Sequence, residues 1–242
     1  MTINATDVGF AELNEKIRAC DDKDVSVTGC LGQRFIACGM SDKNLTIEGV
    51  PGNAMGAYLN GASIYVKGNA QDAVGDTMNN GMIVIGGSIG DAAGYAMRGG
   101  EIYVKRNAGY RAGIHMKAYR EKKPVMVIGG RAGSFLGEYQ AGGYIIVLGI
   151  DIGDKPIVGN FPCTGMHGGK MFLRTNAEKC GIDFPGQVKV RAAEDEDKAE
   201  IIRFVEKYCE LFGEDVEKIM ASDFTVISPD SKNPYKQMYV AN

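Results

Sequence analysis

The chain has 242 residues, with 27 Lys or Arg against 30 Asp or Glu, so its formal net charge is −3. This balance argues against a protein that binds nucleic acid or an anionic membrane, which would normally carry a basic surplus. We find no apolar stretch of about 18 residues and no signal peptide, which predicts a cytoplasmic protein without a transmembrane helix. The six cysteines form no C-x-x-C pair and are expected to be free thiols.

The first regular element predicted along the chain is a helix over residues 8–20. Phe10, Leu13 and Ile17 fall at helical spacing, and Asp7 is a suitable N-cap. We expect this helix to close one end of the molecule, as an N-terminal helical cap of residues 1–22.

Glycine dominates the middle of the chain and recurs there at a fixed step. It makes up 34 of the 242 residues, about twice its usual share. Three glycine columns repeat every 19 residues, with an insertion at residues 119–124, and Arg106 and Gln71 each replace one glycine. Since glycine permits φ > 0 and close backbone approach, we predict bends at each column. The glycines assigned this structural role are Gly49, Gly52, Gly56, Gly68, Gly75, Gly87, Gly90, Gly94, Gly109, Gly113, Gly130, Gly133 and Gly137.

Aliphatic residues keep the same step and predict one short strand in each repeat. One column contains Leu45, Ile64, Ile83, Ile102, Met126 and Ile145, and the column two positions later contains Ile47, Val66, Ile85, Val104, Ile128 and Val147. Residues two apart in a strand share a face, so both columns are expected to point inward. Fainter copies begin at Val25 and Gly168, and residues 188–190 are a candidate last copy. We therefore predict a mainly β protein, a single-stranded β-helix of about 19-residue rungs over residues 23–192.

The last part of the chain is predicted to be helical. Ile201, Val205, Tyr208 and Phe212 form one apolar stripe over residues 194–212, and Gly213 ends it. A short helix near residues 214–221 follows. We expect residues 193–242 to form a C-terminal helical extension that caps the other end of the β-helix. The acidic run at 194–197 is interpreted as a solvated helix start that suits the helix dipole, rather than a metal site.

Few residues suggest chemistry. Gly86–Gly90 fits the G-x-S-x-G pattern of hydrolases, in which Ser88 would be the nucleophile and His115 or His167 the base. Ser88 occupies a repeat position filled elsewhere by asparagine, and no helix is predicted after it, so a serine esterase is the weaker hypothesis. Cys163 and His167 have the spacing of two metal ligands, but no further ligands stand near them in sequence. We predict no catalytic, cofactor-binding or metal-binding residue in this chain.

The repeats resemble a known family. The motifs GNAMG at 52–56, KGNAQDAVG at 67–75 and KPIVGN at 155–160, with LGQRF at 31–35, are similar to the C-terminal GXGXG domain of the glutamate synthase large subunit, here in a stand-alone form. The resemblance implies a right-handed β-helix that serves as a non-catalytic scaffold of a glutamate synthase-like oxidoreductase complex, in glutamate biosynthesis and ammonia assimilation. It implies as partners the synthase domain or subunit, which would hold FMN and an iron–sulfur cluster, and the amidotransferase, with no cofactor in this chain.

Two alternatives keep a binding role but change the partner. Formylmethanofuran dehydrogenase contains a similar β-helical scaffold, so the chain is also compatible with a subunit of that kind. A repeat protein that associates with copies of itself, as a homo-oligomer, is the other alternative.

Overall fold

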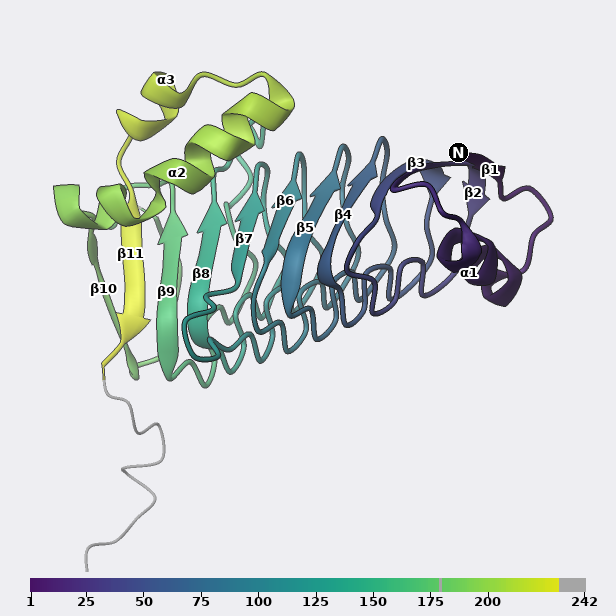
Figure 1. The fold of residues 1–242 in the computed structure, drawn as a ribbon. Helices are drawn as coiled ribbons and strands as arrows, with labels where there is room; N and C mark the ends of the chain where they lie inside the picture. The colour runs from purple at the N-terminus through teal and green to yellow at the C-terminus, as the bar shows by residue number, and fades with distance from the viewer. Residues whose placement is uncertain (179, 231–242) are drawn as a thin grey trace, which may run out of the picture.

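The computed structural model describes residues 1–178 and 180–230, which form eleven strands and three helices (Figure 1). The elements in chain order are β1 (Thr2–Asn4), α1 (Phe10–Ala19), β2 (Asp24–Leu31), β3 (Asn44–Val50), β4 (Asn60–Val66), β5 (Asn80–Ile85), β6 (Glu101–Val104), β7 (Val125–Ile128), β8 (Ala141–Val147), β9 (Gly168–Leu173), β10 (Val188–Ala192), α2 (Asp195–Phe212), α3 (Val216–Met220) and β11 (Thr225–Pro229). None of these three helices combines the length and apolarity that crossing a membrane requires.

All eleven strands belong to one sheet, and β1 to β9 lie in it side by side in chain order and parallel. The register confirms that the two aliphatic columns pair. Leu45 is opposite Ile64, Ile64 opposite Ile83, and Ile83 opposite Ile102. These residues are at most 2% exposed and belong to one core that runs the length of the sheet. Burial of such aliphatic side chains is the main stabilising contribution to the fold, at about 1.5–3 kcal/mol for each.

The predicted architecture, a single-stranded right-handed β-helix with capping helices, is wrong. The described residues form one mostly parallel eleven-stranded sheet. The segments that join its strands contain turns and isolated bridges, as between Ala70 and Ile89, rather than further strands. Residues 188–190, expected as a last parallel copy, belong instead to the edge strand β10. The chain returns from α3 as β11, which lies antiparallel between β9 and β10 and separates them.

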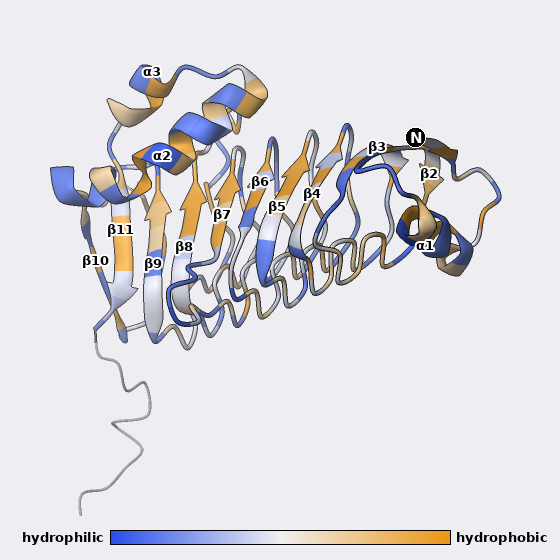
Figure 2. Cartoon of the chain, viewed as in Figure 1, coloured by the Kyte–Doolittle hydropathy of each residue, from blue (hydrophilic) through white to orange (hydrophobic). Residues whose placement is uncertain are grey.

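The outward face of the sheet explains why the C-terminal helix does not close an end. Its central column begins with polar side chains, Ser26 and Thr46, and becomes apolar at Val84. From there it continues as Tyr103, Val127, Ile146, Phe172 and Val226. These residues share a second core with the apolar side of α2, which therefore lies across the face of the sheet (Figure 2).

Ion pairs fix α2 on this face. Asp197 is 3% exposed, and its carboxylate accepts two hydrogen bonds from the Arg191 guanidinium and one from Lys170 Nζ at 3.1 Å. The Tyr144 hydroxyl donates to Glu200 Oε2 at 2.8 Å. Of the acidic run interpreted as solvated, Asp197 is thus buried, where it pairs with Lys170 of β9 and Arg191 of β10.

Helix α1 starts two residues later than predicted. Asp7 has φ 58° in the preceding turn, and Gly9 rather than Asp7 is the N-cap. Leu13 and Ile17 are fully buried in the same core as the inward side chains of the sheet. The helices α2 and α3 span nearly the residues predicted for them, 194–212 and 214–221, although α2 lies on the face of the sheet and not at its end. The domain boundaries at 22/23 and 192/193 stay predictions, and residues 231–242 of the predicted extension lie outside the described residues.

Candidate functional site

The turns that follow the strands share one backbone pattern, in which residues at positions i, i+2 and i+4 all adopt left-handed φ between 50° and 70°. The pattern occurs in seven turns, and many of its residues are not glycine. The first column contains Phe35, Ala54, Ala73, Ala92, Arg111, Phe135 and Phe161; the middle column Ala37, Gly56, Gly75, Gly94, Gly113, Gly137 and Cys163; and the third Gly39, Tyr58, Thr77, Ala96, His115, Tyr139 and Gly165.

Hydrogen bonds between neighbouring turns hold this backbone. Ala54 N donates forward to Asp72 O at 2.9 Å, Gly56 N donates back to Ile36 O at 2.8 Å, and Tyr58 N donates forward to Asp76 O at 2.7 Å. The same alternation recurs along the stack. Left-handed φ costs a non-glycine residue about 1–2 kcal/mol, and it persists because bonds to both neighbouring turns determine it.

The middle column faces the core, and steric crowding explains its glycines. A Cβ at Gly113 would lie 2.4 Å from Ile145 Cδ1, and one at Gly75 would lie 2.7 Å from Ile102 Cδ1. Side chains enter this column only in its first and last turns, at Ala37 and Cys163.

The thirteen glycines selected from the sequence fall into two kinds. Six have left-handed φ, namely Gly49, Gly56, Gly75, Gly94, Gly113 and Gly137. The other seven do not, namely Gly52, Gly68, Gly87, Gly90, Gly109, Gly130 and Gly133. Most of these seven lie instead too close to the preceding turn for a side chain; a Cβ at Gly90, for example, would lie 2.0 Å from Asp72 Oδ1. Their structural role stays a prediction that substitution tests.

Arg106 replaces one glycine of these columns, and the length of the side chain one turn earlier explains why a larger residue fits there. A Cβ at Gly87 would lie 2.2 Å from Asn69 Oδ1, and one at Gly130 would lie 2.3 Å from Asn107 Oδ1. Arg106 stands between them in the column, and there the preceding turn carries the shorter Ser88. Nothing in the structure explains Gln71 in the same way.

The two outer columns, with neighbouring turn positions, present aromatic side chains to solvent. His115 stacks on Tyr139 at 5.0 Å between ring centroids and meets the edge of Tyr95 at 5.9 Å. Phe135 lies 5.3 Å from Phe161, which is 59% exposed. We call this set, with the exposed Tyr110, the aromatic ridge: Tyr95, Tyr110, His115, Phe135, Tyr139 and Phe161.

An ion pair lies beside Phe135 of the ridge. The Arg111 guanidinium lies 4.8 Å over the Phe135 ring, and its Nε donates to Glu138 Oε2 at 3.0 Å. Sequence reasoning singled out only His115 among the ridge residues. Two columns that keep the step of the glycines could have revealed three more of them, since Tyr139 shares a column with Tyr58 and His115, and Phe135 and Phe161 share one with Phe35.

The residues considered for chemistry are occupied with structural contacts. Ser88 Oγ accepts from Asn107 N at 3.3 Å, and no hydrogen bond within the described residues joins Ser88 to either histidine. Cys163 points into the core, 3.6 Å from Met171 Sδ, and burial raises the pKa of its thiol. His167 Nδ1 contacts Gly165 O at 3.0 Å. Residues 1–178 and 180–230 contain no group of three or more His, Cys, Asp or Glu arranged to hold a metal ion.

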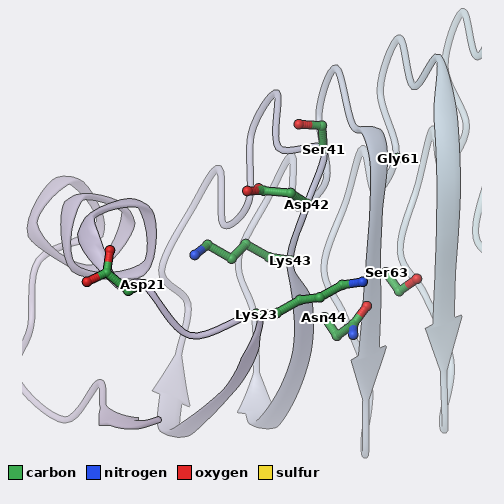
Figure 3. Close-up of a pocket in the computed structure, with 8 residues that line it drawn as sticks. All are labelled: Asp21, Lys23, Ser41, Asp42, Lys43, Asn44, Gly61 and Ser63. Carbon is green, nitrogen blue, oxygen red and sulfur yellow. The ribbon is translucent and has the colours of Figure 1, made fainter.

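An open polar hollow of about 630 Å³ lies beside the start of β2, β3 and β4 (Figure 3). Lys43, one of its lining residues, donates to Cys20 O and, at 3.0 Å, to Asp22 O. The amine therefore holds the end of α1 in place, and no hydrogen bond among the described residues joins the Ser41 or Ser63 hydroxyl of the hollow to a basic group.

Comparisons with known proteins agree with this fold. The model of the GXGXG motif family matches residues 12–231. A protein of Methanocaldococcus jannaschii, described as uncharacterized, is 46% identical over 252 residues, which cover 99% of this chain and 96% of that protein. A chain in the crystal structure of the formyltransferase/hydrolase complex from Methylorubrum extorquens, bound to methylofuran, is similar with a TM-score of 0.63 and 17% identity, over 95% of this chain and 91% of that one. At that identity the likeness extends to the fold alone. As its repeats suggested, the chain belongs to the GXGXG motif family.

Proposed function

We propose that this chain is a non-catalytic scaffold subunit, and that the aromatic ridge is the surface on which it holds a partner subunit. The observation that carries the proposal is the ridge itself. Its side chains other than that of the half-buried Phe135 are exposed, on a backbone whose turns are hydrogen-bonded to both neighbours. Exposed aromatic clusters mark protein interfaces, and a rigid display lowers the entropic cost of binding.

The partner we propose is the synthase subunit of a glutamate synthase-like complex, with the amidotransferase as a second partner. Membership of the GXGXG motif family supports this choice. FMN and the iron–sulfur cluster would then belong to the synthase subunit. The cysteines of this chain do not fit a cluster, which needs several thiolates together: Cys30 and Cys163 are buried, and burial raises the pKa of the Cys30 thiol to about 11.

A second candidate is a scaffold subunit of the formylmethanofuran dehydrogenase type. The observation that favours it is the similarity in fold to a chain of a formyltransferase/hydrolase complex. The two candidates differ in the chemistry of the partner, because one predicts a flavin and iron–sulfur subunit and the other a molybdopterin enzyme.

Affinity purification of the full chain from its native cells tests the proposal. We expect a coloured flavin and iron–sulfur subunit to co-purify with the wild type, and to be lost from the Tyr139→Ala/Phe161→Ala variant. Tyr65→Ala is the matched control, because Tyr65 is 39% exposed on the face of the sheet and Tyr139 is 37% exposed on the ridge.

Three results would contradict the proposal. The ridge variant could retain the partner as well as the control does. The isolated chain could carry stoichiometric flavin or release ammonia from glutamine. Sedimentation could show that the ridge joins copies of this chain and nothing else.

A further inference from the structure

The insertion at residues 119–124, which interrupts the 19-residue step, forms with Ala118 a tight loop that packs on its neighbours. Tyr119 and Lys122 exchange two backbone hydrogen bonds of 3.0 Å each. The loop lies against glycines on both sides, so that it packs directly on the neighbouring turns. A Cβ at Gly99 would lie 3.1 Å from Lys122 Cβ, and one at Gly142 would lie 2.4 Å from Ala118 N.

This loop gathers positive charge. Arg120, Lys122 and Lys123 come from the loop itself, while Arg98 and Lys117 precede it on adjacent turns, and all five are exposed. Among residues 1–178 and 180–230, none of the five forms an ion pair. We call them the basic patch: Arg98, Lys117, Arg120, Lys122 and Lys123.

Two acidic residues lie near the patch, and neither forms an ion pair with it within the described residues. Glu101 accepts a hydrogen bond from the Tyr103 hydroxyl at 2.7 Å, and Glu121 stands at the tip of the loop. Lys122, Lys123 and Glu101 line a shallow hollow of about 240 Å³ next to the start of β6. Lys123 Nζ lies 5.8 Å over the Tyr144 ring, and neither lysine forms an ion pair within the described residues, so the hollow can accept a carboxylate side chain from another protein.

We propose that the basic patch is a docking surface for an acidic face of a partner subunit. This inference rests on the proposed function, which it deepens by naming the chemistry of a second contact. The chain as a whole carries a formal charge of −3, so the patch is a local feature that orients an acidic partner. The patch and the aromatic ridge are close along the chain, since Arg98 follows Tyr95 by three residues and Lys117 follows His115 by two.

One feature favours a protein over a polyphosphate. Tyr119 is 50% exposed, with the Arg120 guanidinium 5.3 Å over its ring. Tyrosine and arginine together are typical of the centre of protein–protein interfaces.

The test uses the full chain and two labelled probes of similar charge, a 20-residue poly-L-glutamate and a 20-nucleotide single-stranded DNA. Binding is measured by fluorescence anisotropy at low salt. Lys122→Glu/Lys123→Glu removes the patch, and Lys105→Glu/Arg106→Glu is the matched control, because it reverses two adjacent exposed cations outside the patch. Circular dichroism checks that both variants fold.

We expect the wild type and the control to bind poly-glutamate alike, and the patch variant to bind it at least about tenfold more weakly. Equal binding by the two variants, or no binding by the wild type, would overturn the proposal. So would tighter binding of the DNA, which would assign the patch to nucleic acid. If no flavin and iron–sulfur subunit co-purified with the wild type while poly-glutamate binding was intact, the proposed function would fail and the basic patch would stand as an acid-binding surface.

Discussion

Substitution of Ser88 by asparagine tests whether the side chain in one turn decides which residue the next turn tolerates. Asn69 and Asn107 each place Oδ1 within 2.3 Å of where a Cβ would stand in the next turn, and glycine occupies both positions. Ser88 lies one turn before Arg106, the one residue with a side chain among Gly87, Arg106 and Gly130. Ser88→Asn should therefore crowd the Arg106 Cβ and lower the free energy of unfolding by about 1–3 kcal/mol.

The second substitution of the cycle, Arg106→Gly, removes the obstructed atom. Alone it should cost about 0.5–1 kcal/mol, because glycine loses more backbone freedom on folding. In the double variant the asparagine can bond the next backbone N–H, as Asn69 bonds Ser88 N at 2.8 Å. We expect the double variant to be as stable as Arg106→Gly alone, which is a coupling energy of at least about 1 kcal/mol.

Urea unfolding followed by circular dichroism gives the four free energies of this cycle, provided that the slope with denaturant is the same for all variants. Costs that add to within about 0.5 kcal/mol would refute the reasoning, because they would show that the two positions do not interact. Asn107→Ser is a further check. It shortens the side chain before Gly130 and should make Gly130→Ala less costly than it is in the wild type.

Two further predictions concern the core and the helix on the sheet. Gly113→Ala should lower the free energy of unfolding by about 2–4 kcal/mol, because of its left-handed φ and because the new methyl would overlap Ile145 Cδ1. Ile145→Val removes Cδ1 and should recover part of that loss. An undiminished cost of Gly113→Ala in the Ile145→Val background would contradict the steric explanation. The Arg191 guanidinium lowers the pKa of the Asp197 carboxyl from 3.8 to about 2, so its stabilisation is complete above about pH 4 and is lost as the pH falls toward 2. Asp197→Asn should flatten the acid limb of a curve of stability against pH, and an unchanged slope there would count against the ion pair.

The sequence predicted strand pairing well and helix placement less well, for a definite reason. Leu45, Ile64 and Ile83 recur at the step of the repeat, and residues that stack on their own copies reveal their register directly. The outward column carries a weaker signal, because it changes from Thr46 to Val84 partway along the sheet. That change is what brings α2 onto the face of the sheet, and attention to the inward columns alone missed it.

The aromatic ridge was missed because left-handed φ was attributed to glycine alone. Tyr58, His115 and Tyr139 adopt it although each has a Cβ. Their conformation is set by hydrogen bonds to the neighbouring turns, which local propensity does not include. In the sequence, such residues can be recognised only because they recur at the spacing of the repeat.

In the stacked turns, different groups make the hydrogen bonds, fill the core and face the solvent, and this arrangement suits a binding surface. Backbone groups are used for stacking, and the middle column is used for the core, where Gly113 has no room for a side chain. The side chains of the outer columns are needed neither for the hydrogen bonds between turns nor for the core, and they are as different as those of Ala73, Arg111 and Phe161. Side chains in those columns can therefore change what the surface binds with little effect on the free energy of unfolding. For the same reason, loss of a partner in the Tyr139→Ala/Phe161→Ala variant would report on recognition rather than on folding.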